Sequence, residues 1–158
     1  MPEGGDTFYE LDFGFNNPTA LVRRKYYDGD LYCDEVLYAT KLTTGDLIER
    51  LRAIGIREQI FCDNAEPKTI EALYREGFNA LPSEKAVTEG IRTIKSRPLY
   101  VTGTSSNIIR ELKNYKWKVD RDGKTLDEPE KANDHAMDAI RYAGHTKQKT
   151  PSITWGAI

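Results

Sequence analysis

Three aspartates occupy positions from which their carboxylates can act together. Asp12 lies at the predicted end of the first strand, Asp63 follows the short apolar run 59–62, and Asp138 lies in the last predicted helix. Ligands of open α/β sheets usually bind at the carboxyl ends of the strands. Carboxylates packed together there repel one another, and Mg²⁺ or Mn²⁺, which prefer oxygen ligands, relieve that repulsion. Two such ions about 4 Å apart can drive hydrolysis of a phosphodiester.

The first two aspartates each have a structural interpretation as well. Asp12 can hydrogen-bond the backbone of a turn near Gly14. Asp63 can cap a helix that begins near Pro67. Glu66, an acid expected in the first turn of that helix, complements the helix dipole and has a metal-ligand alternative.

The last predicted helix carries a second candidate group beside its aspartate. His135 lies three residues before Asp138, so both side chains project from one side of the helix. There the imidazole can move a proton or orient a ligand, although a lone histidine is often structural. Asp138 can instead form an ion pair with Arg141.

The elements that position these residues follow from hydrophobic spacing and turn signals. Apolar residues predict three strands over 8–12, 19–27 and 31–39, and Asp28-Gly29 between the last two is a hairpin signal. Helices and short strands then alternate, which predicts a mixed sheet of three antiparallel strands followed by parallel strands, with helices on both faces. The predicted helices are 44–54, with Thr44 as a candidate cap and Gly55 as its end, 67–77, 86–95, 105–114 and 133–144. The predicted later strands are 59–62, 79–81, 99–101 and 116–119.

Composition and motifs exclude several classes of protein. The chain has 158 residues, of which 39% are hydrophobic, and this is enough for one domain with a buried core. No apolar run approaches the length of a membrane-spanning helix, and neither a signal sequence nor a C-x-x-C pair is present. The sequence also lacks a Walker A loop and a G-x-G-x-x-G motif. Asp12-Phe13-Gly14 spells the kinase magnesium motif, but the glycine-rich loop and H-R-D segment of kinases are absent.

Charge is unevenly distributed along the chain. Residues 1–80 contain 15 acids and 9 bases, whereas residues 81–158 contain 10 acids and 14 bases. Window 85–118 has eight bases against two acids, which is typical of a polyanion-binding surface or of a solvated helix face. The bases are Lys85, Arg92, Lys95, Arg97, Arg110, Lys113, Lys116 and Lys118.

Five segments in this order resemble the C-terminal nuclease domain of the large terminase subunit of tailed bacteriophages. The resemblance covers roughly residues 8–145, and the Asp-His-x-x-Asp-Ala-x-Arg-Tyr ending is its most specific part. The segments are Leu11-Asp12-Phe13-Gly14-Phe15, residues 63–68 (DNAEPK), Glu89-Gly90-Ile91, residues 111–115 (ELKNY) and residues 133–142 (NDHAMDAIRY).

This resemblance implies an RNase H-like fold and a divalent-metal endonuclease that cuts concatemeric viral DNA during packaging. The family's metal-binding aspartates fall on Asp12, Asp63 and Asp138, with two Mg²⁺ or Mn²⁺ ions expected, and His135 matches a histidine found in some members. Implied partners are double-stranded DNA, an ATPase domain, the small terminase subunit and the portal or procapsid, in the host cytoplasm and without a membrane. The expected DNA-binding residues are Lys85, Arg92, Lys95 and Arg97.

The expected organisation is a flexible leader over 1–7, a nuclease domain over 8–145 and a tail over 146–158. The packaging ATPase of the family is not expected within this chain, because no Walker A loop is present. Two other functions remain open. One is a nuclease similar to Holliday-junction resolvases, and the other is a non-catalytic module that docks on DNA or on a portal.

Overall fold

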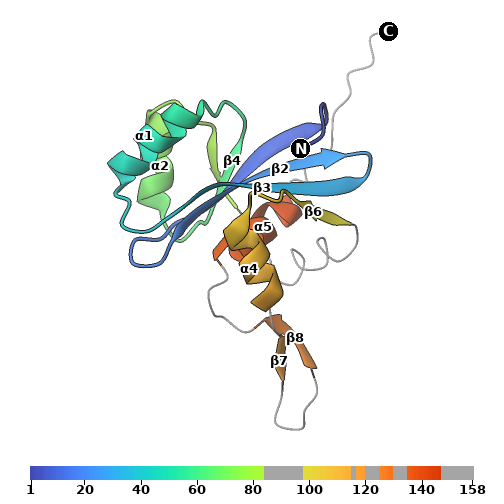
Figure 1. Ribbon diagram of the computed structural model, residues 1–158. Coiled ribbons are helices and arrows are strands. Elements are labelled where there is room, and N and C mark those ends of the chain that lie inside the picture. The colour runs from blue at the N-terminus through green and yellow to red at the C-terminus, as the bar shows by residue number, and fades with distance from the viewer. Residues whose placement is uncertain (84–97, 115–116, 120–124, 130–134, 147–158) are drawn as a thin grey trace.

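A six-stranded sheet covered by helices on both faces forms the body of the protein (Figure 1). The computed structural model describes residues 1–83, 98–114, 117–119, 125–129 and 135–146. The strands are β1 (Asp6–Asp12), β2 (Thr19–Tyr27), β3 (Asp30–Ala39), β4 (Ile60–Cys62), β5 (Ala80–Pro82), β6 (Leu99–Val101), β7 (Trp117–Val119) and β8 (Thr125–Pro129). The helices are α1 (Thr44–Ile54), α2 (Pro67–Arg75), α4 (Ser106–Asn114) and α5 (His135–Thr146).

The sheet has the strand order β5-β4-β1-β2-β3-β6. The first three strands form an antiparallel meander, β4 and β5 extend it parallel to β1, and β6 adds to the other edge parallel to β3. In the β2–β3 turn, Asp28 (φ 51°) and Gly29 (φ 83°) both adopt the left-handed conformation, as a type I′ hairpin requires. The predicted mixed sheet is therefore confirmed.

Alternation along the strands sends apolar side chains to two separate cores. On one face, β1, β2 and β4 pack against α1 and α2, and on the other face β2 and β3 pack against α4 and α5 (Figure 1). The first core includes Leu11, Leu21, Leu47, Leu51, Ile60, Ile70 and Leu73, and the second includes Val22, Leu31, Ile108, Ala136, Ala139 and Ile140.

The structure differs from the sequence prediction at several element ends. The cap of α1 is Thr43, in a capping box with Asp46, and not Thr44, whereas Gly55 ends this helix as predicted. Strand β1 begins at Asp6, two residues before its predicted start. Strand β8, which pairs with β7 in a separate two-stranded sheet, was not predicted. The predicted helix 86–95 and residues 147–158 of the predicted tail lie outside the described residues.

Both cysteines are free and buried. Burial raises the pKa of Cys33 and of Cys62 to about 12. A thiol that stays protonated is a weak nucleophile and a weak metal ligand. Cys62 and Cys33 pack among the apolar side chains of the first and the second core, respectively.

A buried ion pair fastens α5 to the sheet. Arg24 of β2 is fully buried, and its Nη1 donates hydrogen bonds of 2.5 Å to Glu10 Oε1 of β1 and of 2.5 Å to the carbonyl of Ile140 in α5. The guanidinium also lies over the rings of Phe8 and Tyr26. One cation thus joins two strands and a helix that is 116 residues away in sequence.

Removing one partner of this pair should destabilise the protein strongly. Glu10→Ala leaves the Arg24 charge buried without its carboxylate, and the expected loss in unfolding free energy is about 3–5 kcal/mol. The double variant Glu10→Leu with Arg24→Met replaces both charges by apolar groups and should recover most of that loss. Urea unfolding of the three proteins measures this, and a Glu10→Ala loss below about 1 kcal/mol would contradict it.

Candidate active site

Two of the three aspartates emerge side by side from neighbouring parallel strands. Leu11 of β1 pairs with Cys62 of β4, and the Asp63 backbone N–H extends the ladder by donating to the Leu11 carbonyl over 3.0 Å. Asp12 and Asp63 are the next residues on strands that lie about 4.8 Å apart. Leu11 faces α1 and α2, so alternation turns Asp12 to the α5 side. In that position Asp12 is only 7% exposed.

The start of α5 supplies the other two candidate residues. His135 is the first residue of α5, and its Nδ1 lies 3.3 Å from Asp12 Oδ2. Asp138 follows three residues later on the same side of the helix, and both side chains are half-buried. Since α5 packs against β1, β2 and β4, this side of its first turn faces the edge where Asp12 and Asp63 emerge.

The structure decides between several interpretations of the acidic residues. Asp63 Oδ1 accepts a hydrogen bond from Ala65 N, and the N-cap position of α2 is held by Glu66, so of the two interpretations of Asp63 the structure does not support the helix cap. Glu66 is the N-cap residue of α2, not a first-turn acid, and it makes no side-chain cap hydrogen bond. Arg141 belongs to α5, but its side chain lies outside the described part, so its predicted pairing with Asp138 is not tested.

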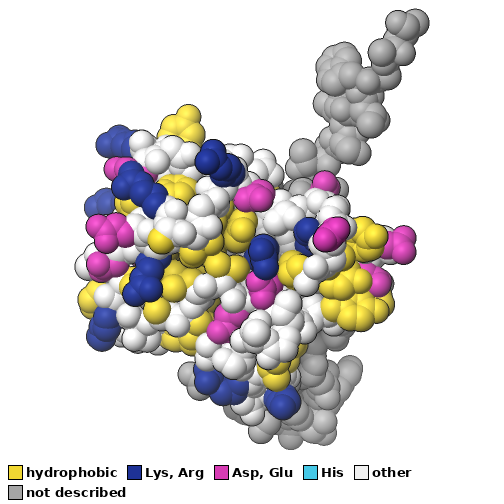
Figure 2. Space-filling view, turned by 45° about the horizontal axis from the view of Figure 1, so that its top comes forward, with side chains coloured by type: hydrophobic (Ala, Val, Ile, Leu, Met, Phe, Trp, Pro, Cys, Tyr) yellow, Lys and Arg dark blue, Asp and Glu magenta, His cyan; other side chains and the backbone are white. Residues whose placement is uncertain are grey.

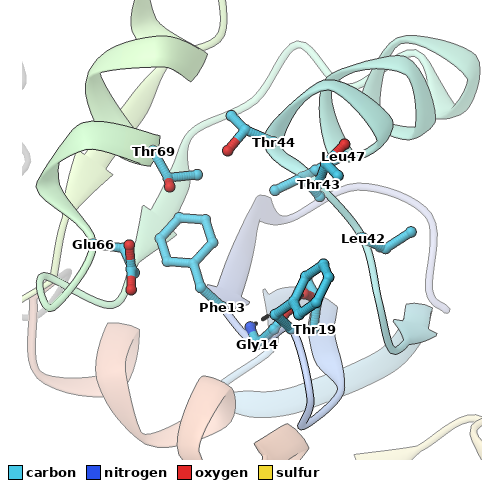
Figure 3. Close-up of a pocket in the computed structure, with 10 residues that line it drawn as sticks. Phe13, Gly14, Thr19, Leu42, Thr43, Thr44, Leu47, Glu66 and Thr69 are labelled. Atoms are coloured by element: carbon cyan, nitrogen blue, oxygen red, sulfur yellow. Dashed lines mark hydrogen bonds between the residues drawn. The ribbon is translucent and has the colours of Figure 1, made fainter.

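The turn after Asp12 is held by a hydrogen-bonded pair. Gly14 N donates to Thr19 Oγ1 over 3.2 Å, and Thr19 Oγ1 donates to the Gly14 carbonyl over 2.6 Å. Figure 3 shows this turn at the base of a cavity of about 390 Å³, into which Phe13 projects between α1 and α2. A Cβ on Gly14 would lie 2.5 Å from the Asn17 carbonyl oxygen, so only glycine fits here.

Two buried acids next to α5 had no function assigned from sequence. Glu10 contacts α5 indirectly through Arg24. Glu111 of α4 accepts hydrogen bonds directly from the first turn of α5, and burial raises its pKa despite those bonds. The sequence did contain a signal that Glu111 is buried. Its spacing from Ile108 and Leu112 places a carboxylate within the apolar stripe of a helix.

The donor set fits a hard divalent cation by its chemistry. Carboxylate oxygens of Asp12, Asp63 and Asp138 are the ligands that Mg²⁺ and Mn²⁺ prefer. No group of three or more His, Cys, Asp or Glu side chains within the described ranges is already arranged to hold a metal ion. Asp12, Asp63 and Asp138, all within those ranges, therefore do not already form such a group.

The predicted DNA-binding residues fall outside the part of the chain that the structure describes. These are Lys85, Arg92, Lys95 and Arg97. Arg110 and Lys113 of the same basic window are exposed on α4. On the face in Figure 2, Lys and Arg side chains alternate with Asp and Glu side chains over α1 and α2. No described helix is long and apolar enough to span a bilayer.

Comparison with known proteins identifies relatives along most of the chain. Residues 12–145 match the family model described as the terminase RNAseH like domain. The chain is 29% identical over 157 residues to the terminase large subunit of Escherichia phage T5, covering 89% of this chain and 35% of the relative. It is 29% identical over 160 residues to that of Bacillus phage SPP1, covering 92% and 37%. The chain therefore spans little more than a third of these relatives.

A solved structure shows the same fold. The crystal structure of the large terminase nuclease domain from bacteriophage SPP1 with bound Mn superimposes with a TM-score of 0.78 at 26% identity. The match covers 90% of this chain and 86% of that one. The mixed sheet described above is thus an RNase H-like fold, as the sequence predicted.

Substitution of Gly14 should disturb the turn that follows Asp12. Gly14→Ala brings a methyl group within 2.6 Å of two backbone oxygens, those of Asn17 and Pro18. Overpacking of this kind costs about 1–3 kcal/mol. Gly103→Ala is the matched control, because nothing lies within 4 Å of its Cβ position. Urea unfolding should show a loss for Gly14→Ala only, and equal stability of both variants would contradict the steric argument.

Proposed function

Because this chain belongs to the terminase RNase H-like domain family, we propose that it is a metal-dependent DNA endonuclease that cuts concatemeric viral DNA during genome packaging. The observations that support the proposal are the adjacency of Asp12 and Asp63 at the ends of β1 and β4 and the contact of His135 of α5 with Asp12. The Mn bound in the SPP1 nuclease-domain structure supports the choice of a divalent metal.

The three aspartates have distinct places in the proposed metal site. Asp12, which neighbours Asp63 on the adjoining strand and contacts His135 of α5, would contact two Mg²⁺ or Mn²⁺ ions, while Asp63 and Asp138 would each complete the ligand set of one. Two such ions activate water for in-line attack and stabilise the leaving oxygen of a phosphodiester. Weak binding without DNA is expected, because substrate phosphate supplies part of the ligand set.

His135 is proposed to orient the shared carboxylate. With the proton on Nδ1, the ring donates to Asp12 Oδ2, and the unprotonated Nε2 is the acceptor atom of the ring. The imidazole therefore acts first on Asp12, and any proton it moves passes through Nε2.

The wider assignments follow from the family. We propose double-stranded DNA as the substrate, held through phosphate contacts with little sequence preference by Lys85, Arg92, Lys95 and Arg97. The curated relatives are more than twice as long as this chain, which supports an ATPase domain in the full protein, together with the small subunit and portal as partners. These partners place the activity in the host cytoplasm.

Supercoiled-plasmid cleavage with Mn²⁺, Mg²⁺ or EDTA tests the proposal. Nicking and linearisation should require the metal and should disappear in Asp12→Asn and Asp138→Ala, which remove proposed ligands. Both variants should stay folded, because removing one of several repelling acids does not destabilise the metal-free site. Asp46→Asn, which removes an exposed acid of α1, should cut like the parent protein.

The outcome separates the alternative functions. Cutting retained by Asp138→Ala would overturn the site assignment. A preference for four-way junctions over linear duplex would favour a resolvase-like nuclease. A docking module would be favoured by a well-folded protein that shifts DNA on a gel but does not cut it with any of the metal ions tested. The melting temperature of such a protein would be the same with and without Mn²⁺.

A further inference from the structure

A carboxylate from α4 anchors the first turn of α5. Glu111 is 4% exposed, and its Oε2 accepts hydrogen bonds from Ala136 N over 2.8 Å and from Met137 N over 3.0 Å. Its Oε1 accepts a hydrogen bond of 2.8 Å from the hydroxyl of Tyr38 in β3. The carboxylate therefore links a strand, α4 and the helix that carries His135 and Asp138.

The two anchored amides lie between the two candidate site residues. Helices leave their first N–H groups without partners inside the helix, and an anion at that end is favoured by the helix dipole. Ala136 and Met137 are the second and third residues of α5, so they fall directly after His135 and directly before Asp138. Two hydrogen bonds to one oxygen restrain both the position of this turn along the helix axis and its rotation about that axis.

The burial of Glu111 argues for a specific function of its charge. A buried carboxylate loses its hydration, and an apolar residue at this position would avoid that cost. Two of its three hydrogen bonds come from α5, and they compensate only while α5 keeps its present position. The carboxylate therefore favours one placement of α5, whereas the apolar contacts of Ala136 and Ala139 with the sheet are compatible with small shifts.

We propose that Glu111, held by Tyr38, is a positioning residue that sets the place of His135 and Asp138 relative to Asp12. The proposal rests on the proposed nuclease function for its catalytic consequence. The placement of α5 is a separate statement that can be measured without metal. Glu111 contacts neither the metal nor the substrate in this scheme.

The start of α4 is capped by a carboxylate in the same way. Glu35 of β3 accepts hydrogen bonds of 2.9 Å from Asn107 N and of 2.9 Å from Ile108 N at the start of α4. That helix start keeps a second anchor, because Ser105 Oγ accepts a bond from the backbone N–H of Glu35. Glu35→Ala thus removes an equivalent helix cap from a turn that carries no proposed metal ligand.

The test compares Glu111→Ala, Glu111→Gln, Tyr38→Phe and Glu35→Ala with the parent chain. NMR without metal follows the His135 ring signals and the exchange of the Ala136 and Met137 amides. Titration with Mn²⁺ alone gives the metal affinity, and plasmid nicking is separated into kcat and KM. Circular dichroism and melting curves confirm that each variant is folded at the assay temperature.

Glu111→Ala should shift the His135 signals, speed exchange of both amides and weaken Mn²⁺ binding by about 10–100-fold, the usual effect of losing a group that orients metal ligands. Its kcat should fall while KM for DNA stays near the parent value. Glu111→Gln should recover most of the affinity, because its amide oxygen still accepts both N–H groups. The Mn²⁺ affinity of Tyr38→Phe should lie between those of Glu111→Gln and Glu111→Ala. Glu35→Ala should change the melting temperature but leave the other measured quantities near the parent values.

Each result bears on one statement. If Glu111→Ala keeps the parent's His135 spectrum, amide exchange and Mn²⁺ affinity, the positioning inference is wrong whatever its melting temperature. If Glu35→Ala weakens Mn²⁺ binding as much as Glu111→Ala does, the effect is general destabilisation and the inference is again wrong. If the parent chain itself neither binds Mn²⁺ nor cuts DNA, the proposed function fails, while the NMR comparison still decides whether Glu111 places α5.

Discussion

The placement of α5 on the sheet is the constraint on which the candidate site depends. Apolar packing presses this helix against β1 and β2 but has no preferred direction along the sheet. Buried polar groups fix the position of α5 along the sheet at two points of the helix. The Glu111 carboxylate binds its first turn, and the Arg24 guanidinium binds the Ile140 carbonyl. Alanines at positions 136 and 139 keep the helix close enough to the sheet for both contacts.

The edge that receives α5 is electrostatically unfavourable by itself. Asp12 is almost fully buried next to the strand end that carries Asp63, and the register of β1 with β4 prevents the two from separating. Backbone pairing and the apolar side chains of Leu11 and Cys62 hold them there against their repulsion. His135 lies against Asp12 from the α5 side, and a protonated ring would offset part of the negative charge.

The sequence was sufficient for most of the fold, because that information is local. Alternation in β1, the Asp28-Gly29 turn and the glycine after α1 each depend on neighbours within a few residues. Reliance on short-range signals also explains why the helix caps were misassigned. Thr43 and Thr44 are equally good caps by type, and only the hydrogen bond to Asp46 N distinguishes them. Asp63 resembles a cap but closes a tighter turn with Ala65.

Of the proposed site, the sequence predicts only the candidate ligands. The carboxylates are recognisable by residue type at strand ends, and the helical spacing of His135 and Asp138 places both on one side. The contact of His135 with Asp12 spans 123 residues, and the contacts of Glu111 span 25 and 26. No local pattern contains such pairings. They depend on how α4 and α5 lie over the sheet, and that packing fixes the angle of a helix more finely than a hydrophobic stripe can.

The ligands of the proposed site therefore differ in how firmly they are held. Asp12 and Asp63 belong to strands whose backbones are hydrogen-bonded to each other, so their separation is fixed as soon as the sheet forms. Asp138 belongs to a helix located by side-chain contacts with Glu111 and Arg24, which a displacement of α4 or of β2 would alter. In the proposed site, the distance between the strand carboxylates and the helix carboxylate is therefore set by side-chain packing, whereas the distance between the two strand carboxylates is set by backbone pairing.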